Sequence, residues 1–167
     1  MELIEELLRL EYDGRAHLLT DGAVSFYQLG NAFYNMSYFG NSWQVLDLFR
    51  SGSNWQYSSK GNQYFTYESE LGNIENMNLD KAKHYYETAL EIARDKELKA
   101  KICFMLAKCS LNEFYLDKDT NYDSYDDKVP ELPEQYFKYH KRLIEEFSDT
   151  EFFEEAIEEC SFLEAYK

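Results

Sequence analysis

Two apolar stripes separated by a short polar step constrain the fold of this chain more than any other feature. Between Asn78 and Ser110, small or apolar residues recur at helical spacing on both sides of Arg94-Asp95-Lys96. The first stripe consists of Ala82, Tyr86, Ala89 and Leu90, and the second of Cys103, Leu106, Ala107 and Ser110. Because so short a step leaves little room for a loop, the two helices are predicted to lie antiparallel.

Polar residues beside these stripes predict where each helix begins. Asn78 can accept hydrogen bonds from the free amides of a first helical turn, and Asp95 can cap the helix that follows. Small side chains at Ala82, Ala89 and Ala107 mark the places where the two helices approach most closely. The stretch therefore predicts two tightly packed helices.

The order Ala82, Tyr86, Ala89 resembles the second helix of a tetratricopeptide (TPR) repeat, a family of stacked helical hairpins of about 34 residues. Upstream, four residues match the spacing of that family's first helix: Phe26, Leu29, Gly30 and Phe33. The resemblance implies an all-α, TPR-like α-solenoid, a right-handed stack of about three antiparallel helical hairpins with flanking helices. It also implies one TPR-like domain over residues 1–167 that acts as a protein-interaction or scaffolding module.

Other amphipathic segments supply the remaining predicted helices. They cover residues 2–12, 22–38, 42–50, 62–71 and 134–147. Asp13-Gly14 is predicted to end the first of these helices, and Asp21 to cap the second. The stripe of the 134–147 helix is predicted to hold Tyr136, Phe137, His140, Leu143, Ile144 and Phe147. Ser148 and Glu151 form a capping box for a last helix, in a segment that also resembles the junction between helices of bacterial TPR proteins. The repeat register between Asn62 and Met77 stays open.

Charge narrows the range of partners. The formal net charge is −15, so nucleic acids and anionic lipid surfaces are repelled at long range, and no nucleic-acid partner is predicted. No apolar run reaches membrane-spanning length, and three cysteines do not support a disulfide framework. The end at Ala165-Tyr166-Lys167, directly after a helix, is compatible with a fragment of a longer, exported protein, which leaves the compartment and the oligomeric state open.

The predicted binding surface follows from the resemblance. In TPR proteins the concave groove is lined mainly by first helices, on the side away from the residues that pack the repeats. In this chain that side presents Tyr27, Asn31, Tyr34, Asn35, Lys101, Phe104, Lys108 and Asn112. A helical wheel places each of the two sets opposite its packing stripe. Rings and amides there can hold an extended peptide, and the two lysines can receive an acidic residue.

Two alternatives remain from the residues. Trp43, Trp55 and Tyr57 could form a carbohydrate-binding platform if their rings are exposed. Within the run from Asp117 to Lys128, oxygen-bearing residues alternate as in an EF-hand calcium loop, although Tyr122 replaces the turn glycine and Lys128 the bidentate glutamate. Histidines are scattered without metal-ligand spacing, and no catalytic motif occurs. The sequence therefore predicts a protein that is not an enzyme and has no cofactor or metal.

Overall fold

The computed structural model describes residues 2–18, 21–45, 77–117, 129 and 131–166. Every regular element within these ranges is helical, which confirms the all-α prediction. The elements are α1 (Glu2–Ala16), α2 (Gly22–Met36), the 3-10 helix η1 (Trp43–Val45), α4 (Asp80–Ile92), α5 (Lys96–Asp117), α6 (Glu134–Phe147), α7 (Glu151–Glu159) and α8 (Ser161–Tyr166). Among the described helices, none has the length and apolar character needed to cross a bilayer.

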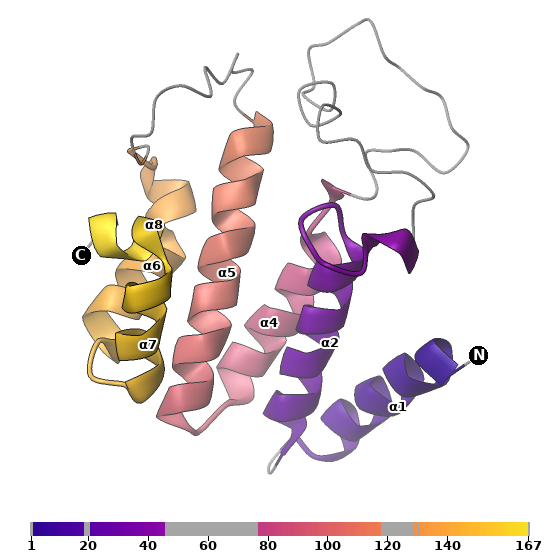
Figure 1. Ribbon diagram of the computed structural model, residues 1–167. Coiled ribbons are helices and arrows are strands. Elements are labelled where there is room, and N and C mark those ends of the chain that lie inside the picture. Colours follow the sequence, from indigo (N-terminus) through magenta and orange to yellow (C-terminus); the bar gives the residue numbers. More distant parts are fainter. Residues whose placement is uncertain (1, 19–20, 46–76, 118–128, 130, 167) are drawn as a thin grey trace, which may run out of the picture.

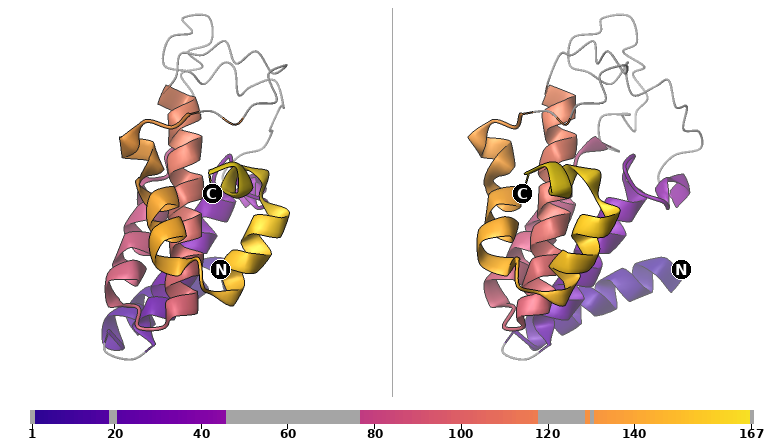
Figure 2. Two further views of the ribbon diagram at one scale, coloured as in Figure 1. Left: turned by 90° about the vertical axis from the view of Figure 1, so that its left-hand side faces the viewer. Right: turned by 60° about the vertical axis from the view of Figure 1, so that its left-hand side comes forward.

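The helices pack mainly as neighbours in two pairs. α2 lies against α4 and α5 lies against α6, while α1 covers part of α2 and α7 contacts α5 (Figure 1). α4 also contacts α5 and runs in the opposite direction. In the left view of Figure 2, α4 and α6 lie on one side and α7 on the other, with α5 between them. The arrangement leaves α2, α5 and α7 to form one face.

The two stripes that dominate the sequence form the centre of the core. All eight of their residues are buried, including Tyr86 and Cys103, both at 0% exposure. Asn78 accepts a hydrogen bond through Oδ1 from the backbone amide of Asp80 at 2.6 Å, and Asp95 accepts through Oδ2 from the amide of Leu98 at 2.8 Å. Asp95 therefore caps α5 as predicted, whereas Asn78 holds the first amide of α4 from one position before the N-cap, which is Leu79.

Two glycines in the first helices allow close contact with a neighbouring helix. A Cβ atom at Gly30 would lie 2.5 Å from the Tyr86 ring, so glycine lets α2 and α4 approach closely. Gly14 was expected to end the first helix, but α1 continues to Ala16. A Cβ at Gly14 would lie 2.8 Å from Cε1 of Phe26. The prediction was wrong because this glycine serves a helix contact and not a turn.

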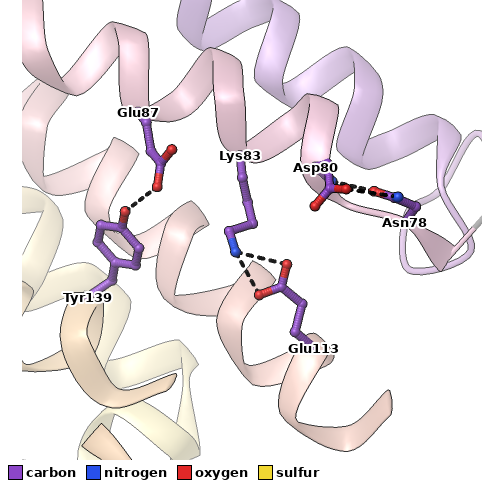
Figure 3. A network of polar contacts seen from close by, with 6 residues as sticks. All are labelled: Asn78, Asp80, Lys83, Glu87, Glu113 and Tyr139. Carbon is purple, nitrogen blue, oxygen red and sulfur yellow. Dashed lines mark hydrogen bonds and ion pairs between the residues drawn. The ribbon is translucent and has the colours of Figure 1, made fainter. Parts of the chain in front are cut away.

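Polar contacts join α4 to both helices of the second pair (Figure 3). The Lys83 Nζ lies 2.9 and 2.7 Å from the two carboxylate oxygens of Glu113 on α5, and both side chains are about three-quarters shielded. The Tyr139 hydroxyl on α6 donates to the Glu87 carboxylate. Burial and this carboxylate raise the pKa of Tyr139. The phenol therefore stays protonated and keeps its role as donor.

Several predicted helix ends need correction. The Asp21 side chain makes no capping hydrogen bond, and α2 ends at Met36, not at Tyr38. There the backbone amide of Ser37 donates to carbonyls of Phe33 and Tyr34 as the chain turns extended. Of the predicted 42–50 helix, the structure describes only Ser42 and the 3-10 turn η1, while the predicted 62–71 helix lies outside the described residues.

α6 has the predicted bounds, but its buried face is rotated relative to the predicted stripe. His140, Leu143 and Phe147 are buried as expected, together with Tyr139, whereas Tyr136, Phe137 and Ile144 are only half-buried. The last helix also divides, because Cys160 adopts an extended conformation between α7 and α8. The buried side of α6 is the side that packs on α5, which local spacing alone does not specify.

The predicted capping box at Ser148 is also wrong. Ser148 ends α6, and Thr150 is the N-cap of α7, accepting from the Phe153 amide at 3.2 Å. The carboxylate of Glu97 on α5 accepts from the amides of Glu151 and Phe152, each at 3.0 Å. The first amides of α7 are thus held partly by a residue distant in sequence, which a local motif cannot predict.

Candidate binding surface

The predicted residues of α2 lie over the buried Tyr86 of α4. Tyr86 donates its hydroxyl proton to Oδ1 of Asn31 at 2.7 Å, and Nδ2 of Asn35 donates to the Asn31 carbonyl at 2.9 Å. Burial raises the pKa of Tyr86, so the donor remains protonated. The Tyr27 ring centroid lies 6.0 Å from that of Tyr86. A core residue thereby orients the amide of Asn31 at the surface.

The predicted residues of α5 meet those of α2 around Tyr34. Nδ2 of Asn112 lies 3.2 Å from the Tyr34 hydroxyl oxygen, with which it forms a hydrogen bond. The Lys108 Nζ lies 5.4 Å from the centroid of the Tyr34 ring and 5.7 Å from that of Phe104. The structure therefore brings residues from both predicted sets into contact. Tyr34 is buried, so it forms the floor of this surface and not an exposed ring.

A third helix extends the surface beyond the predicted set. The Phe152 ring of α7 packs edge-on against Phe104, with 5.5 Å between centroids, and Lys101 Nζ lies 5.9 Å from the Phe152 centroid. Phe152 was not among the residues predicted for this surface. The resemblance of residues 145–156 to a junction between helices was the signal that the next helix could also contribute to this face.

We call these residues the α2–α5–α7 surface: Tyr27, Asn31, Tyr34, Asn35, Lys101, Phe104, Lys108, Asn112 and Phe152. None of them is acidic, although the whole chain is strongly so. Within the described ranges, neither Lys101 nor Lys108 forms an ion pair, whereas Lys83, Lys96 and Lys141 each contact a carboxylate. Both ammonium groups lie over aromatic rings instead, which leaves their charge available to an anion.

A separate hollow of about 590 Å³ lies beside the start of α6. Its described lining consists of Pro133, Glu134, Gln135, Phe137, Lys138 and Lys141. None of these belongs to the α2–α5–α7 surface. Since its described walls come from a single helix and the proline before it, the hollow lacks the convergent polar groups of a built site.

The residues behind the two alternative predictions fall mostly outside the described ranges. Trp43 is half-buried, while Trp55 and Tyr57 are not described. The side chains from Asp117 to Lys128 are likewise outside, so the calcium loop stays a prediction. Among the residues with described positions, no group of three or more histidine, cysteine or acidic side chains could hold a metal ion.

The cysteines offer no reactive thiol in the core. Cys103 and Cys109 are free and buried, and burial raises the pKa of each thiol to about 12. They are therefore protonated and poorly nucleophilic at neutral pH. Cys160 is also free and is half-buried.

Comparison with known proteins gives no family for the chain: no family model, curated protein or solved structure matches it.

Proposed function

We propose that this chain is a TPR-like helical stack that binds an extended, acidic segment of a partner protein on the α2–α5–α7 surface. The observation that carries the proposal is the meeting of Tyr34, Lys108 and Asn112 from two helices far apart in the sequence. Ring faces, amides and unpaired lysines on one face are the groups that hold an extended peptide and its carboxylates. Catalysis is not part of the proposal.

Helix packing supports the TPR-like part of this proposal. The first-helix pattern around Gly30 packs on the second-helix pattern around Tyr86, as a repeat of that family requires. α2, α5 and α7 would then be successive first helices, and α4 and α6 the second helices behind them. Curvature of such a stack makes the face formed by first helices concave.

Charge supports the acidic partner. Against a net charge of −15, a carboxylate-bearing segment is repelled by most of the molecule and attracted where Lys101 and Lys108 lie. Lys108 is half-buried among rings, so a carboxylate that reaches it is partly shielded from water and the pairing is stronger than on an open surface. Specificity would then come from the lysines, and contact area from Phe104 and Phe152.

The test uses a pool of short, labelled peptides rich in aspartate and glutamate, passed over immobilised protein. We expect the wild type to retain acidic peptides and the variant Lys101→Glu, Lys108→Glu to lose them. The matched control is Lys138→Glu, Lys141→Glu, which changes net charge equally on the exposed side of α6. Circular dichroism should show unchanged helicity in both, because Lys101 is exposed and Lys108 half-exposed.

Two results would overturn the proposal. One is equal retention by the wild type and the Lys101→Glu, Lys108→Glu variant, and the other is no retention of any acidic peptide. Loss of binding in the Lys138→Glu, Lys141→Glu control alone would move the site to the hollow beside α6, which these two lysines line.

A further inference from the structure

α1 exposes an apolar stripe on the side that faces away from α2. Ile4 is 65% exposed, Leu8 61% and Tyr12 71%, and the spacing of four residues puts them on one face of the helix. The opposite side of α1 is occupied, because Leu10 and Gly14 are buried and Gly14 contacts Phe26 of α2. Figure 1 shows α1 at the edge of the molecule, in contact with α2 and extending away from it. The stripe thus has no cover from the described residues.

We propose that a second copy of this chain covers the stripe, in an antiparallel pairing of two α1 helices about a two-fold axis at Leu8. The stripe is symmetric about Leu8, since Ile4 precedes it by four residues and Tyr12 follows it by four. In the antiparallel pairing, Ile4 of each copy therefore lies opposite Tyr12 of the other, and the two Leu8 side chains meet. A surface that is complementary to itself in this way is what a two-fold interface requires.

Charges beside the stripe fit the same register. Glu5 and Arg9 lie on one flank of the stripe, because they are four residues apart. When Leu8 meets Leu8, Glu5 of one copy lies about 3 Å along the helix axis from the level of Arg9 of the other. Glu5 forms no ion pair within the described chain, whereas on the other flank Glu11 is already neutralised by Arg15 at 2.7 Å. Arg9 already lies 2.6 Å from Glu6 and 2.7 Å from Asp13 within its own copy, so Glu5 of the other copy joins an existing ion-pair cluster, and the apolar stripe supplies most of the stabilisation.

A second copy fits this stripe better than a head-to-tail neighbour. In the described part of the chain, every large hydrophobic residue with high exposure lies between Leu3 and Val45. The C-terminal helices α7 and α8 present no such residue and carry Glu151, Glu154 and Glu155 exposed. Among the described residues, the N-terminal helices therefore hold the exposed apolar side chains that can face this stripe. A single pair of 15-residue helices is a small interface, so we expect a dimer that dissociates on dilution.

Sedimentation velocity over a range of concentrations, at physiological and at raised salt, tests the pairing. We expect the wild type to move from monomer to dimer as concentration rises, more readily at raised salt, which screens the repulsion between two strongly negative copies. Leu8→Glu should weaken the dimer at least about tenfold. The control Val45→Glu replaces an apolar residue away from α1 that is 51% exposed, and it should leave the dimer unchanged.

Disulfide trapping in a Cys160→Ser background tests the register. Leu8→Cys should cross-link to itself under mild oxidation, because the two Leu8 positions meet at the axis. Ile4→Cys should not link to itself but should link to Tyr12→Cys when the two proteins are mixed. A monomer at all concentrations, a dimer insensitive to Leu8→Glu, or cross-linking of Ile4→Cys to itself would each overturn the proposal.

Discussion

Gly30 lies at a point where one added methyl group has no room. Its absent Cβ would be 2.5 Å from two atoms of the Tyr86 ring, and that ring is fully buried and hydrogen-bonded to Asn31. Gly30→Ala should gain about 1 kcal/mol in helix propensity and lose more to overpacking. We expect a net loss of about 1–2 kcal/mol in the free energy of unfolding, measured by urea denaturation.

Gly14→Ala is the matched control for this change. It adds the same methyl group within a helix, but its closest neighbours are atoms at the outer edge of the Phe26 ring, at 2.8 Å and beyond. A ring can move its edge more easily than its inner atoms, so Gly14→Ala should cost less. If Gly30→Ala proves as stable as the wild type, or less costly than Gly14→Ala, the close contact between α2 and α4 is wrong.

His140 links stability to pH. Its ring stacks on Phe137 with centroids 6.0 Å apart and meets the edge of Tyr166 at 5.0 Å. Burial lowers the pKa of His140 to about 4, and the backbone carbonyl of Tyr136 offsets only part of this. The unfolded chain, with an ordinary pKa near 6.5, therefore binds more protons between these values. The contribution of the neutral ring is complete above the unfolded pKa and is lost as pH falls toward 4.

Urea unfolding at pH 7.5 and at pH 5 measures this loss, and His140→Phe supplies the comparison. Each pKa unit corresponds to about 1.4 kcal/mol, so the wild type should lose about 2 kcal/mol more than the variant between the two pH values. Carboxylates titrate in both proteins and cancel in the difference. Parallel losses in the two proteins would show that His140 is accessible to protons in the folded state.

At the scale of elements, the start of α7 depends on one hydroxyl group. Thr150 is 2% exposed, accepts from the Phe153 amide and donates to the Phe147 carbonyl at 2.7 Å. Thr150→Val keeps the shape and removes both bonds, so we expect a loss of about 1–2 kcal/mol in unfolding free energy. Ser148→Ala should change almost nothing, because Ser148 is exposed and lies at the end of α6. Equal effects of both substitutions on the thermal midpoint would contradict this assignment of the cap.

A helix is predicted well from the sequence when the residues that define it lie within its own segment. The extents of α4 and α6 were predicted closely because apolar residues at helical spacing mark each segment, as Tyr86 and Leu143 illustrate. The end of α1 was predicted wrongly because Gly14 packs against the Phe26 ring of α2 and does not form a turn. The start of α7 was missed for the same reason, since Glu97 holds its first amides from α5. Local sequence patterns predict that a helix is present, while contacts between helices determine where several of the helices begin or end.

At the scale of the whole molecule, the resemblance to the TPR family selected the sides of α2 and α5 that meet, and helical spacing agreed with that selection. Tyr34, Lys108 and Asn112 come together although they were chosen from separate helices. What spacing could not supply is how far the surface continues, because Phe152 joins it only through the packing of α7 on α5. The burial of Tyr34 likewise depends on tertiary contacts, so a helical wheel could not predict that its ring forms the floor of the surface.

The polar contacts of α4 also bear on how the chain folds. Lys83 and Glu113 are 30 positions apart, and Glu87 and Tyr139 are 52 apart. Such separations raise the contact order, which slows the search for the native pairing. Because α4 packs on α2 and is joined by these contacts to α5 and α6, separating either helix pair breaks bonds shared with the other. We therefore expect the two pairs to unfold together, although repeat arrays can lose one end at a time.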